Sequence, residues 1–349
     1  MQSKDLNNLI SPEKSPFIIA EMSGNHNQSL ERALAIVDAA ADAGAHAIKL
    51  QTYTADTITV KGAHTITDEG SLWKGKELYD LYKEAYTPWE WHKPIFEHAA
   101  KRGLIAFSSP FDTTAVDFLE SLNVPLYKIA SFENTDHILL KKVAATGKPV
   151  IMSTGVSSLG DIEESVSVLR DNGCKELVLL KCTSTYPSTP ENTNLRAIPI
   201  LSKLFNCHAG LSDHTMGIGA AVAATALGAT VIEKHFTLRR ADGGVDSAFS
   251  MEPEEMKQLV IETERAYLAM GRPFIGIQEI EQKSKAFKRS LYVVKDMAAG
   301  DYFTSDNIAS KRPANGLHSR YYNQVIGMKC KSNIKKDTPL SWDIIQTEK

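Results

Sequence analysis

Two histidines, His214 and His235, each stand just after a short apolar run. The runs are 207–211 and 229–232, and the segment between them, Gly217–Gly228, has the small residues of a tightly packed helix. If the runs are parallel strands joined by that helix, the two imidazoles lie side by side at one edge of a sheet. Neutral imidazoles placed in this way can hold a divalent metal ion. The alternative is that His214 orients a loop and His235 packs in the core, and the pair alone does not decide between them.

Lysines and serines form a second group with chemical potential, because each lies near the end of an apolar run. The group consists of Lys49, Ser109, Lys128, Ser131, Ser153 and Ser212. Lysine supplies positive charge and serine supplies hydrogen bonds, and the turn 153–155 offers backbone N–H groups at a helix start, so the group suits a phosphorylated anion. The alternative is that the serines only cap helices. Glu21 and Asp246 are candidate acid/base groups.

Repeated strand-and-helix units position these residues. Apolar runs that end in polar residues alternate with segments of helical periodicity, as in 30–41 before Gly44. The runs are 17–20, 46–51, 104–107, 125–130, 149–152 and 177–180, followed by the two runs before the histidines. Eight such units predict an α/β fold, the (β/α)8 TIM barrel, in which polar strand ends meet at one mouth. A doubly wound sheet would need a Gly-rich dinucleotide turn, and residues 24–26 are not one.

The chain is predicted to divide into a TIM-barrel domain at 1–272, a linker at 273–288 and a small domain at 289–349. The small domain has an internal echo between 294–308 and 332–344, and at its size it is marginal alone. The connection after the second strand, 53–87, is long and carries Trp73, Tyr79 and Tyr82. Long loops at a barrel rim often shape a substrate pocket or a subunit contact.

The composition bounds the classes of function. The chain has 349 residues, 43% hydrophobic and 23% charged, with a net charge of −3. Neither nucleic acid nor a membrane surface is an expected partner for such a charge. The four cysteines have no paired metal spacing and are expected to be reduced thiols, which favours a cytoplasmic protein.

Several motifs, in this order, resemble those of the sialic acid synthases (N-acetylneuraminate synthase-like proteins). They are Glu21 with Asn25-His26, then 47–52, 127–131, 153–155, Gly210-Leu211-Ser212-Asp213-His214-Thr215 and Glu233-Lys234-His235-Phe236. The tail resembles the antifreeze-like (SAF, β-clip) domain of that family, with Lys311-Arg312-Pro313 at its signature loop. The resemblance covers nearly the whole chain.

The resemblance implies a transferase that forms a C–C bond. In that family, C3 of phosphoenolpyruvate attacks the metal-activated aldehyde of an open-chain acetamido sugar. Water adds at C2, and phosphate leaves by C–O cleavage. Carried onto this chain, Lys49, Ser109, Lys128, Ser131, Ser153 and Ser212 would bind phosphoenolpyruvate, and His214 and His235 would bind Mn²⁺, Mg²⁺ or Co²⁺. Glu21, Glu133, Tyr186 and Asp246 would face the sugar or move protons.

The resemblance also implies a homodimer, in which Arg312 of one subunit reaches over the barrel mouth of the other. Within the family, the chain looks most like the pseudaminic acid synthase branch. The segments that resemble this branch are 72–75, 78–82 and 87–89 in the long loop and the run 242–250 after the second histidine. The sugar of that branch is 2,4-diacetamido-2,4,6-trideoxy-L-altrose, and N-acetylneuraminate or legionaminate synthesis is the alternative. Ser184 stands where the neuraminate branch has asparagine, so its contact with phosphoenolpyruvate stays open.

Two other mechanisms are compatible with parts of the sequence. Lys181, at the end of the sixth run, could form an imine in a Schiff-base aldolase. The other possibility is a non-catalytic sugar-binding barrel whose tail mediates contacts. Trapping with borohydride and pyruvate would detect the aldolase, and an absence of phosphate release would indicate the binding protein.

Overall fold

The structure is a computed structural model that describes residues 9–346. The chain forms two compact units, Met1–Gly271 and Arg272–Lys349. The division lies next to the end of the expected barrel domain at residue 272. Among the described residues, every helix is too short or too polar to cross a membrane.

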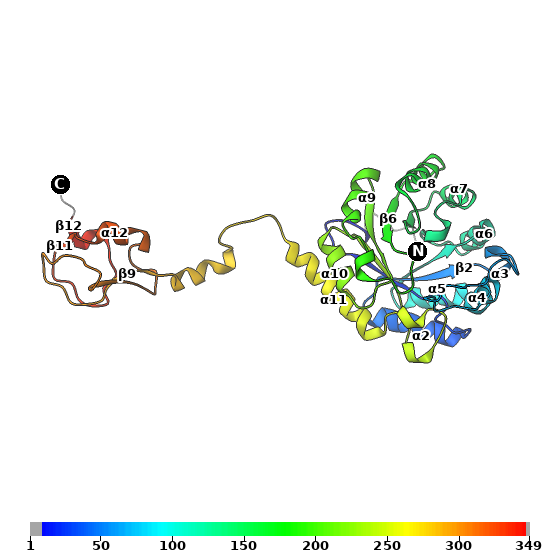
Figure 1. Cartoon of the computed structure of the whole chain (residues 1–349), viewed down its shortest axis with the longest axis horizontal. Helices are drawn as coiled ribbons and strands as arrows, with labels where there is room; N and C mark the ends of the chain where they lie inside the picture. The colour runs from blue at the N-terminus through cyan, green and yellow to red at the C-terminus, as the bar shows by residue number, and fades with distance from the viewer. Residues whose placement is uncertain (1–8, 347–349) are drawn as a thin grey trace. The chain divides into compact units, whose positions relative to one another are not determined.

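The first unit is a closed barrel of eight parallel strands in sequence order, ringed by helices (Figure 1). The strands are β1 (Phe17–Glu21), β2 (Ala47–Thr52), β3 (Ile105–Pro110), β4 (Tyr127–Ile129), β5 (Val150–Ser153), β6 (Leu177–Cys182), β7 (His208–Asp213) and β8 (Val231–His235). β8 closes the barrel on β1, where His235 lies opposite Glu21 in the register. The predicted TIM barrel is confirmed.

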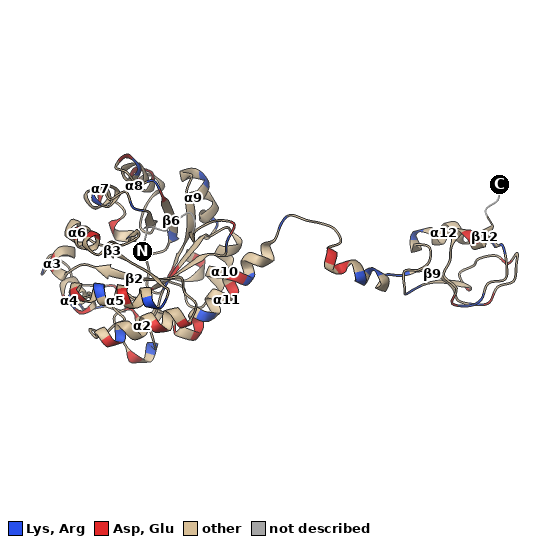
Figure 2. Cartoon of the chain, turned by 180° about the vertical axis from the view of Figure 1, so that it is seen from behind, with Lys and Arg blue, Asp and Glu red and all other residues tan. Residues whose placement is uncertain are grey.

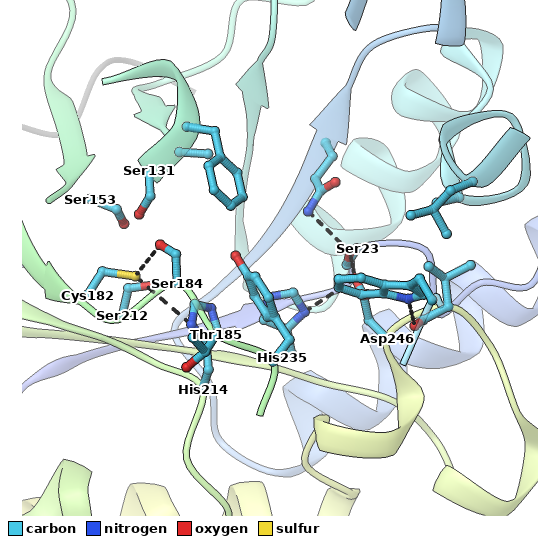
Figure 3. Close-up of a pocket in the computed structure, with 18 of the residues that line it drawn as sticks. Ser23, Ser131, Ser153, Cys182, Ser184, Thr185, Ser212, His214, His235 and Asp246 are labelled. Carbon is cyan, nitrogen blue, oxygen red and sulfur yellow. Dashed lines mark hydrogen bonds and ion pairs between the residues drawn. The ribbon is translucent and has the colours of Figure 1, made fainter. Parts of the chain in front are cut away.

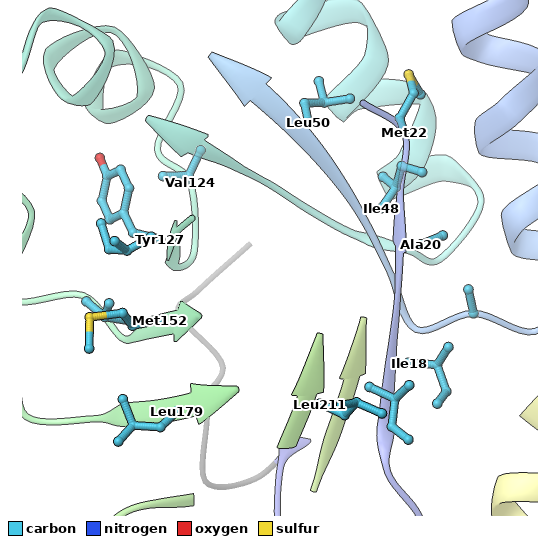
Figure 4. Packing of buried hydrophobic residues seen from close by; sticks show 14 of the residues in the cluster. Ile18, Ala20, Met22, Ile48, Leu50, Val124, Tyr127, Met152, Leu179 and Leu211 are labelled. Carbon is cyan, nitrogen blue, oxygen red and sulfur yellow. The ribbon is translucent and has the colours of Figure 1, made fainter. Parts of the chain in front are cut away.

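Side chains alternate between the two faces of each strand. Inside the barrel, one cluster contains Phe17, Ile19, Phe107, Ile151, Leu180 and Val231. The intervening residues face the helices and form a second, larger layer that includes Ile18, Ala20, Ile48, Leu179 and Leu211 (Figure 4). Because the period is two, a residue two positions beyond an inward-facing hydrophobic residue also points inward. This alternation aims the strand-end side chains at the barrel axis.

Polar side chains cap several helices of the first unit. Ser29, Asp136 and Ser158 accept hydrogen bonds from the first turns of α2, α7 and α8. The helices are α2 (Leu30–Asp42), α3 (Ala55–Ile58), α4 (Leu78–Ala85), α5 (Trp89–Lys101), α6 (Thr113–Ser121), α7 (His137–Ala144), α8 (Leu159–Asp171), α9 (Ala197–Phe205), α10 (Gly219–Ala226) and α11 (Pro253–Met270). Acidic and basic residues are mixed along the outer helices (Figure 2), in keeping with the small net charge.

The second unit is a small β-rich fold with its own core. Strand β9 (Ser290–Val293) pairs with β10 (Ile308–Lys311), and β11 (Lys329–Cys330) pairs with β12 (Ile345–Gln346), both antiparallel. A short helix, α12 (Tyr322–Val325), packs Val325 into a core with Leu291, Phe303 and Ile308. The segment expected to be a linker contains a 3₁₀ helix at Glu279–Phe287.

Candidate active site

A cavity of about 600 Å³ opens at the carboxyl ends of the barrel strands. Most of the predicted site residues line it: Lys49, Lys128, Ser131, Glu133, Ser153, Tyr186, Ser212, His214, His235 and Asp246. Glu21 and Ser109 do not line the cavity themselves. Both contact the Lys49 ammonium group, Glu21 through an ion pair and Ser109 through a hydrogen bond. Arg312 is exposed in the second unit and has no hydrogen-bond or ion-pair partner among the described residues. Figure 3 shows the serines, histidines and Asp246 turned toward the cavity.

The cationic part of the cavity is a buried group of two lysines and two glutamates. Lys49 Nζ lies 2.6 Å from Glu21 Oε2 and 3.7 Å from Glu233 Oε1. Lys128 Nζ lies 3.7 Å from the same Glu233 oxygen and donates a 2.7 Å hydrogen bond to Ser153 Oγ. The second oxygen of Glu233, Oε2, is buried and has no hydrogen-bond partner. Glu233 therefore holds both lysine ammonium groups only loosely, while Lys49 is also paired closely with Glu21.

Charges inside this group perturb one another. Burial opposes ionisation of Glu233, but Lys128 and Lys49 overcome it and hold its pKa below the usual range. Burial raises the pKa of Glu21 and lowers the pKa of Lys128. Carboxylate and ammonium groups with pKa values shifted in this way are frequent at catalytic sites, because burial and nearby charges adjust the pKa of a group to its role in the reaction.

The two predicted histidines are neighbours, with ring centroids 5.3 Å apart. His214 Nδ1 lies 2.9 Å from the carbonyl oxygen of Thr183, which can only accept, so in the neutral ring Nδ1 carries the proton and Nε2 keeps the lone pair. His235 Nδ1 is buried without a hydrogen-bond partner and lies 3.7 Å from Asp246 Oδ2. Burial holds the pKa of His235 well below its usual range, so the ring is neutral.

These two imidazoles fit a metal site with few protein ligands. Neutral nitrogen donors suit divalent transition ions, and the unpartnered Nδ1 of His235 is the kind of buried polar atom that a ligand satisfies. No cluster of three or more His, Cys, Asp and Glu side chains with ligand geometry occurs in residues 9–346. An ion held here would take its remaining ligands from water or substrate.

Three further predicted site residues, Tyr186, Asp246 and Glu133, line the cavity. The Tyr186 ring centroid lies 4.4 Å from that of His214. Asp246 accepts a hydrogen bond from Ser23 Oγ, and burial raises the pKa of this carboxyl. Glu133 belongs to a 3₁₀ turn at Ser131–Glu133, and burial raises its pKa to about 7. A carboxyl with this pKa can give or take a proton near neutral pH.

A hydrogen-bonded chain joins the two ends of the site through residues that the sequence reasoning did not single out. Gln51 Nε2 donates to Glu21 Oε1 at 2.9 Å and to Ser23 Oγ at 3.1 Å, and Ser23 in turn donates to Asp246.

Glu233 and Cys182 were also not predicted as site residues, although period-two alternation from Val231 and Leu180 points both inward. Ser23 carried no such signal, because it lies beyond its strand with a positive φ of 48°.

Two residues left open by the sequence are now placed. Ser184 lines the cavity, with its Oγ 3.7 Å from Cys182 Sγ (Figure 3). Lys181 follows Leu179 on the outward face of β6 and lies outside the cavity lining. Its Nζ donates 2.7 Å and 3.3 Å hydrogen bonds to the Cys182 carbonyl and to Thr183 Oγ1. The geometry thus gives no support to an imine at Lys181.

Glycine at position 155 lets the β5 turn approach the cavity serines. A Cβ at Gly155 would stand 2.2 Å from Ser184 Oγ and 2.7 Å from Ser131 Oγ. The Gly155 N–H donates to Ser131 Oγ at 3.2 Å, while Asn134 Nδ2 donates to the Ser153 and Gly155 carbonyls. The turn is therefore fixed, with its N–H side close to Ser131.

The family model for the NeuB family matches residues 36–274, and that for the SAF domain matches residues 288–346. A relative named "Pseudaminic acid synthase" from Campylobacter jejuni is 43% identical, covering 93% of this chain and 94% of its own length. One of the same name from Helicobacter pylori is 42% identical, covering 95% of this chain and 98% of its own length. The solved N-acetylneuraminic acid synthetase from Leptospira borgpetersenii, in complex with citrate, is 34% identical with a TM-score of 0.72. That match covers 81% of this chain and 95% of the solved chain. The chain belongs to the NeuB family and ends in a SAF domain.

Proposed function

We propose that the chain is a pseudaminic acid synthase. It would condense phosphoenolpyruvate with 2,4-diacetamido-2,4,6-trideoxy-L-altrose and release a nonulosonic acid and phosphate. The observation that carries the proposal is one cavity that joins a buried lysine pair to a histidine pair, in a chain about two-fifths identical to relatives of that name. N-acetylneuraminate and legionaminate synthesis remain the alternatives within the family.

Phosphoenolpyruvate would occupy the inner half of the cavity. Its phosphate and carboxylate would take the ammonium groups of Lys49 and Lys128 and the hydroxyls of Ser131, Ser153 and Ser212, which all line the cavity. Ser109 is placed to act indirectly, because Lys49 Nζ donates to its Oγ at 3.3 Å. Charge-assisted hydrogen bonds of this kind are stronger and shorter than neutral ones, which favours an anion with several oxygens.

His214 and His235 would hold Mn²⁺, Mg²⁺ or Co²⁺. Bound there, the ion would act as a Lewis acid that polarises the aldehyde of the sugar. The protein's part is to keep both rings oriented. The Thr183 carbonyl fixes the His214 tautomer, and Phe249 packs against His235 with ring centroids 4.9 Å apart. Such supporting contacts set the direction in which a ligand nitrogen points.

The reaction needs one group that donates a proton and one that accepts a proton, and the carboxyl groups of the site would fill these roles. C3 of phosphoenolpyruvate bonds to the aldehyde carbon, whose oxygen takes up a proton. Water then adds at C2 and loses a proton, and the C2–O bond to phosphate breaks. Glu133, protonated below about pH 7, would donate to the aldehyde oxygen, and Asp246, which lines the cavity, would accept from water.

The active unit would be a homodimer in which the second unit of one chain covers the cavity of the other. Exposed apolar side chains on 274–287 support this, because an unpartnered connector rarely carries Phe274, Ile275, Ile280 and Phe287 in the open. The unpaired Arg312 would then reach the partner's bound anion. Mixing Arg312→Ala with His214→Ala chains would restore about a quarter of wild-type activity, because half of the random dimers would be mixed and each would hold one complete site.

The four cysteines are free thiols, which supports a reducing, cytoplasmic location.

A phosphate-release screen with phosphoenolpyruvate, Mn²⁺ and a panel of acetamido sugars tests the proposal. The trideoxy diacetamido sugar should give the fastest release. Turnover of N-acetylmannosamine without turnover of the trideoxy sugar would refute the branch assignment. Covalent trapping by borohydride and pyruvate would indicate an aldolase, and full function in His214→Ala would indicate a binding protein.

A further inference from the structure

The outer half of the cavity differs in chemistry from the inner half. Its wall is mainly apolar and aromatic and comes from the β2–β3 connection and the end of β3. The apolar and aromatic wall residues are Ile66, Trp73, Leu78, Leu81, Tyr82 and Phe111, and Asp68, Gly70 and Ser71 of the same connection also line the cavity. Since the lysines and histidines occupy the inner half, a sugar with its aldehyde at the histidines must extend its last carbons toward this wall. The wall therefore contacts the part of the sugar that does not react.

Trp73 is held in this wall by contacts with two other loops. Its indole Nε1 donates a 2.9 Å hydrogen bond to the carbonyl of Val245, on the connection after β8. Its ring centroid lies 5.7 Å from that of Tyr186, which itself packs on His214. The indole is thus fixed between two loops at a defined position relative to the histidine pair.

The hydrogen bond to Val245 also determines what Trp73 can offer a substrate. Indole has a single donor and no acceptor, and that donor is already used. The nearby polar side chains of the same loop turn back into it: Asp68 Oδ1 accepts from the Gly70 N–H at 3.0 Å, and Ser71 Oγ accepts from the Trp73 N–H at 3.2 Å. A substrate hydroxyl against the indole face would lose water and find no replacement partner on Trp73 itself, whereas a methyl group would lose nothing.

We propose that Trp73 is a specificity-determining residue that selects sugars whose terminal carbon is a methyl group over those with a hydroxymethyl group there. This inference rests on the proposed function and deepens it, because it assigns the choice of sugar to one fixed side chain. A wall of this kind discriminates against an added hydroxyl by about 10- to 100-fold in kcat/KM.

The test compares two sugars that differ in one hydroxyl: the trideoxy diacetamido altrose and its 6-hydroxy counterpart. Phosphate release by the full chain with Mn²⁺ gives kcat/KM for each. Wild type should prefer the 6-deoxy sugar by about 10- to 100-fold, and Trp73→Ala should reduce that ratio below about 5, mainly by losing activity on the 6-deoxy sugar. Leu72→Ala is the matched control, since Leu72 lies on the same loop, exposed and outside the cavity lining. It should leave the ratio unchanged.

Trp73→Phe separates the apolar surface from the hydrogen bond to Val245. It keeps an aromatic face without a donor, so the sugar ratio should stay within about threefold of wild type. Equal losses on both sugars in Trp73→Ala, or a collapsed ratio in Trp73→Phe, would overturn the inference while leaving the proposed function intact. A wild-type enzyme that rejects the trideoxy sugar but uses another acetamido sugar would overturn the proposed function instead.

Discussion

Replacing Glu233 with glutamine tests whether a buried charge group prepares the cavity for an anion. Glu233 Oε1 is the shared partner of Lys49 and Lys128 at 3.7 Å from each Nζ, and its side chain is buried. Glutamine keeps the shape and removes the charge. Removing one partner of a buried ion pair costs about 3–5 kcal/mol of unfolding free energy. We expect the lower value, about 3 kcal/mol, because Lys49 keeps Glu21 at 2.6 Å.

The assay is thermal unfolding with and without phosphoenolpyruvate. A loss of about 3 kcal/mol in a unit of this size lowers its melting temperature by roughly 6–12 °C. Phosphoenolpyruvate should raise the melting temperature of both proteins. The increase should be larger for Glu233→Gln than for wild type, because the anion gives both lysines new partners. Glu69→Gln is the control, since the Glu69–Lys74 pair is exposed and should contribute less than about 1 kcal/mol. The reasoning is refuted if Glu233→Gln melts like Glu69→Gln and gains no more from phosphoenolpyruvate than wild type does.

Three further predictions follow from single contacts. The pKa of Glu133, about 7, predicts that kcat/KM falls as pH rises through 7, when the donor loses its proton, and that Glu133→Gln is slower but lacks this inflection; an unchanged inflection in the variant would contradict the assignment. Gly155→Ala should cost about 1–3 kcal/mol of stability and raise the KM for phosphoenolpyruvate, because its Cβ meets Ser131 and Ser184; Gly160→Ala, where a Cβ has room, is the control, and similar KM values in both would contradict this. Lys181→Met should keep activity within about threefold, measured by phosphate release, and complete inactivity would revive the imine mechanism.

The sequence was sufficient for the barrel because one physical rule governs each strand. Alternation along Val231, Glu233 and His235 follows from strand geometry, so the strand ends and their inward residues could be read directly. The same rule predicts that Glu233, two positions before His235, also points into the barrel.

The rest of the site depends on loops that no periodicity describes. Ser23 reaches Asp246 across 223 residues of sequence, and it does so from a left-handed backbone conformation. The bond from Trp73 to Val245 likewise joins two connections on different sides of the mouth. Contacts of this kind follow from tertiary packing, because each loop takes its conformation from the elements that anchor it. The resemblance suggested Asp246 as a site residue, but only the structure shows what holds it.

Condensation of phosphoenolpyruvate with an acetamido sugar aldehyde in this cavity can be measured by its stoichiometry. The assay quantifies the phosphate and the nonulosonic acid formed by the full chain with Mn²⁺, phosphoenolpyruvate and the trideoxy diacetamido sugar. We expect one phosphate per acid, no phosphate without sugar, and loss of both products when Lys128, with its Nζ 2.7 Å from Ser153 Oγ, is changed to methionine. Phosphate release without sugar, or equal turnover in Lys128→Met, would contradict this expectation.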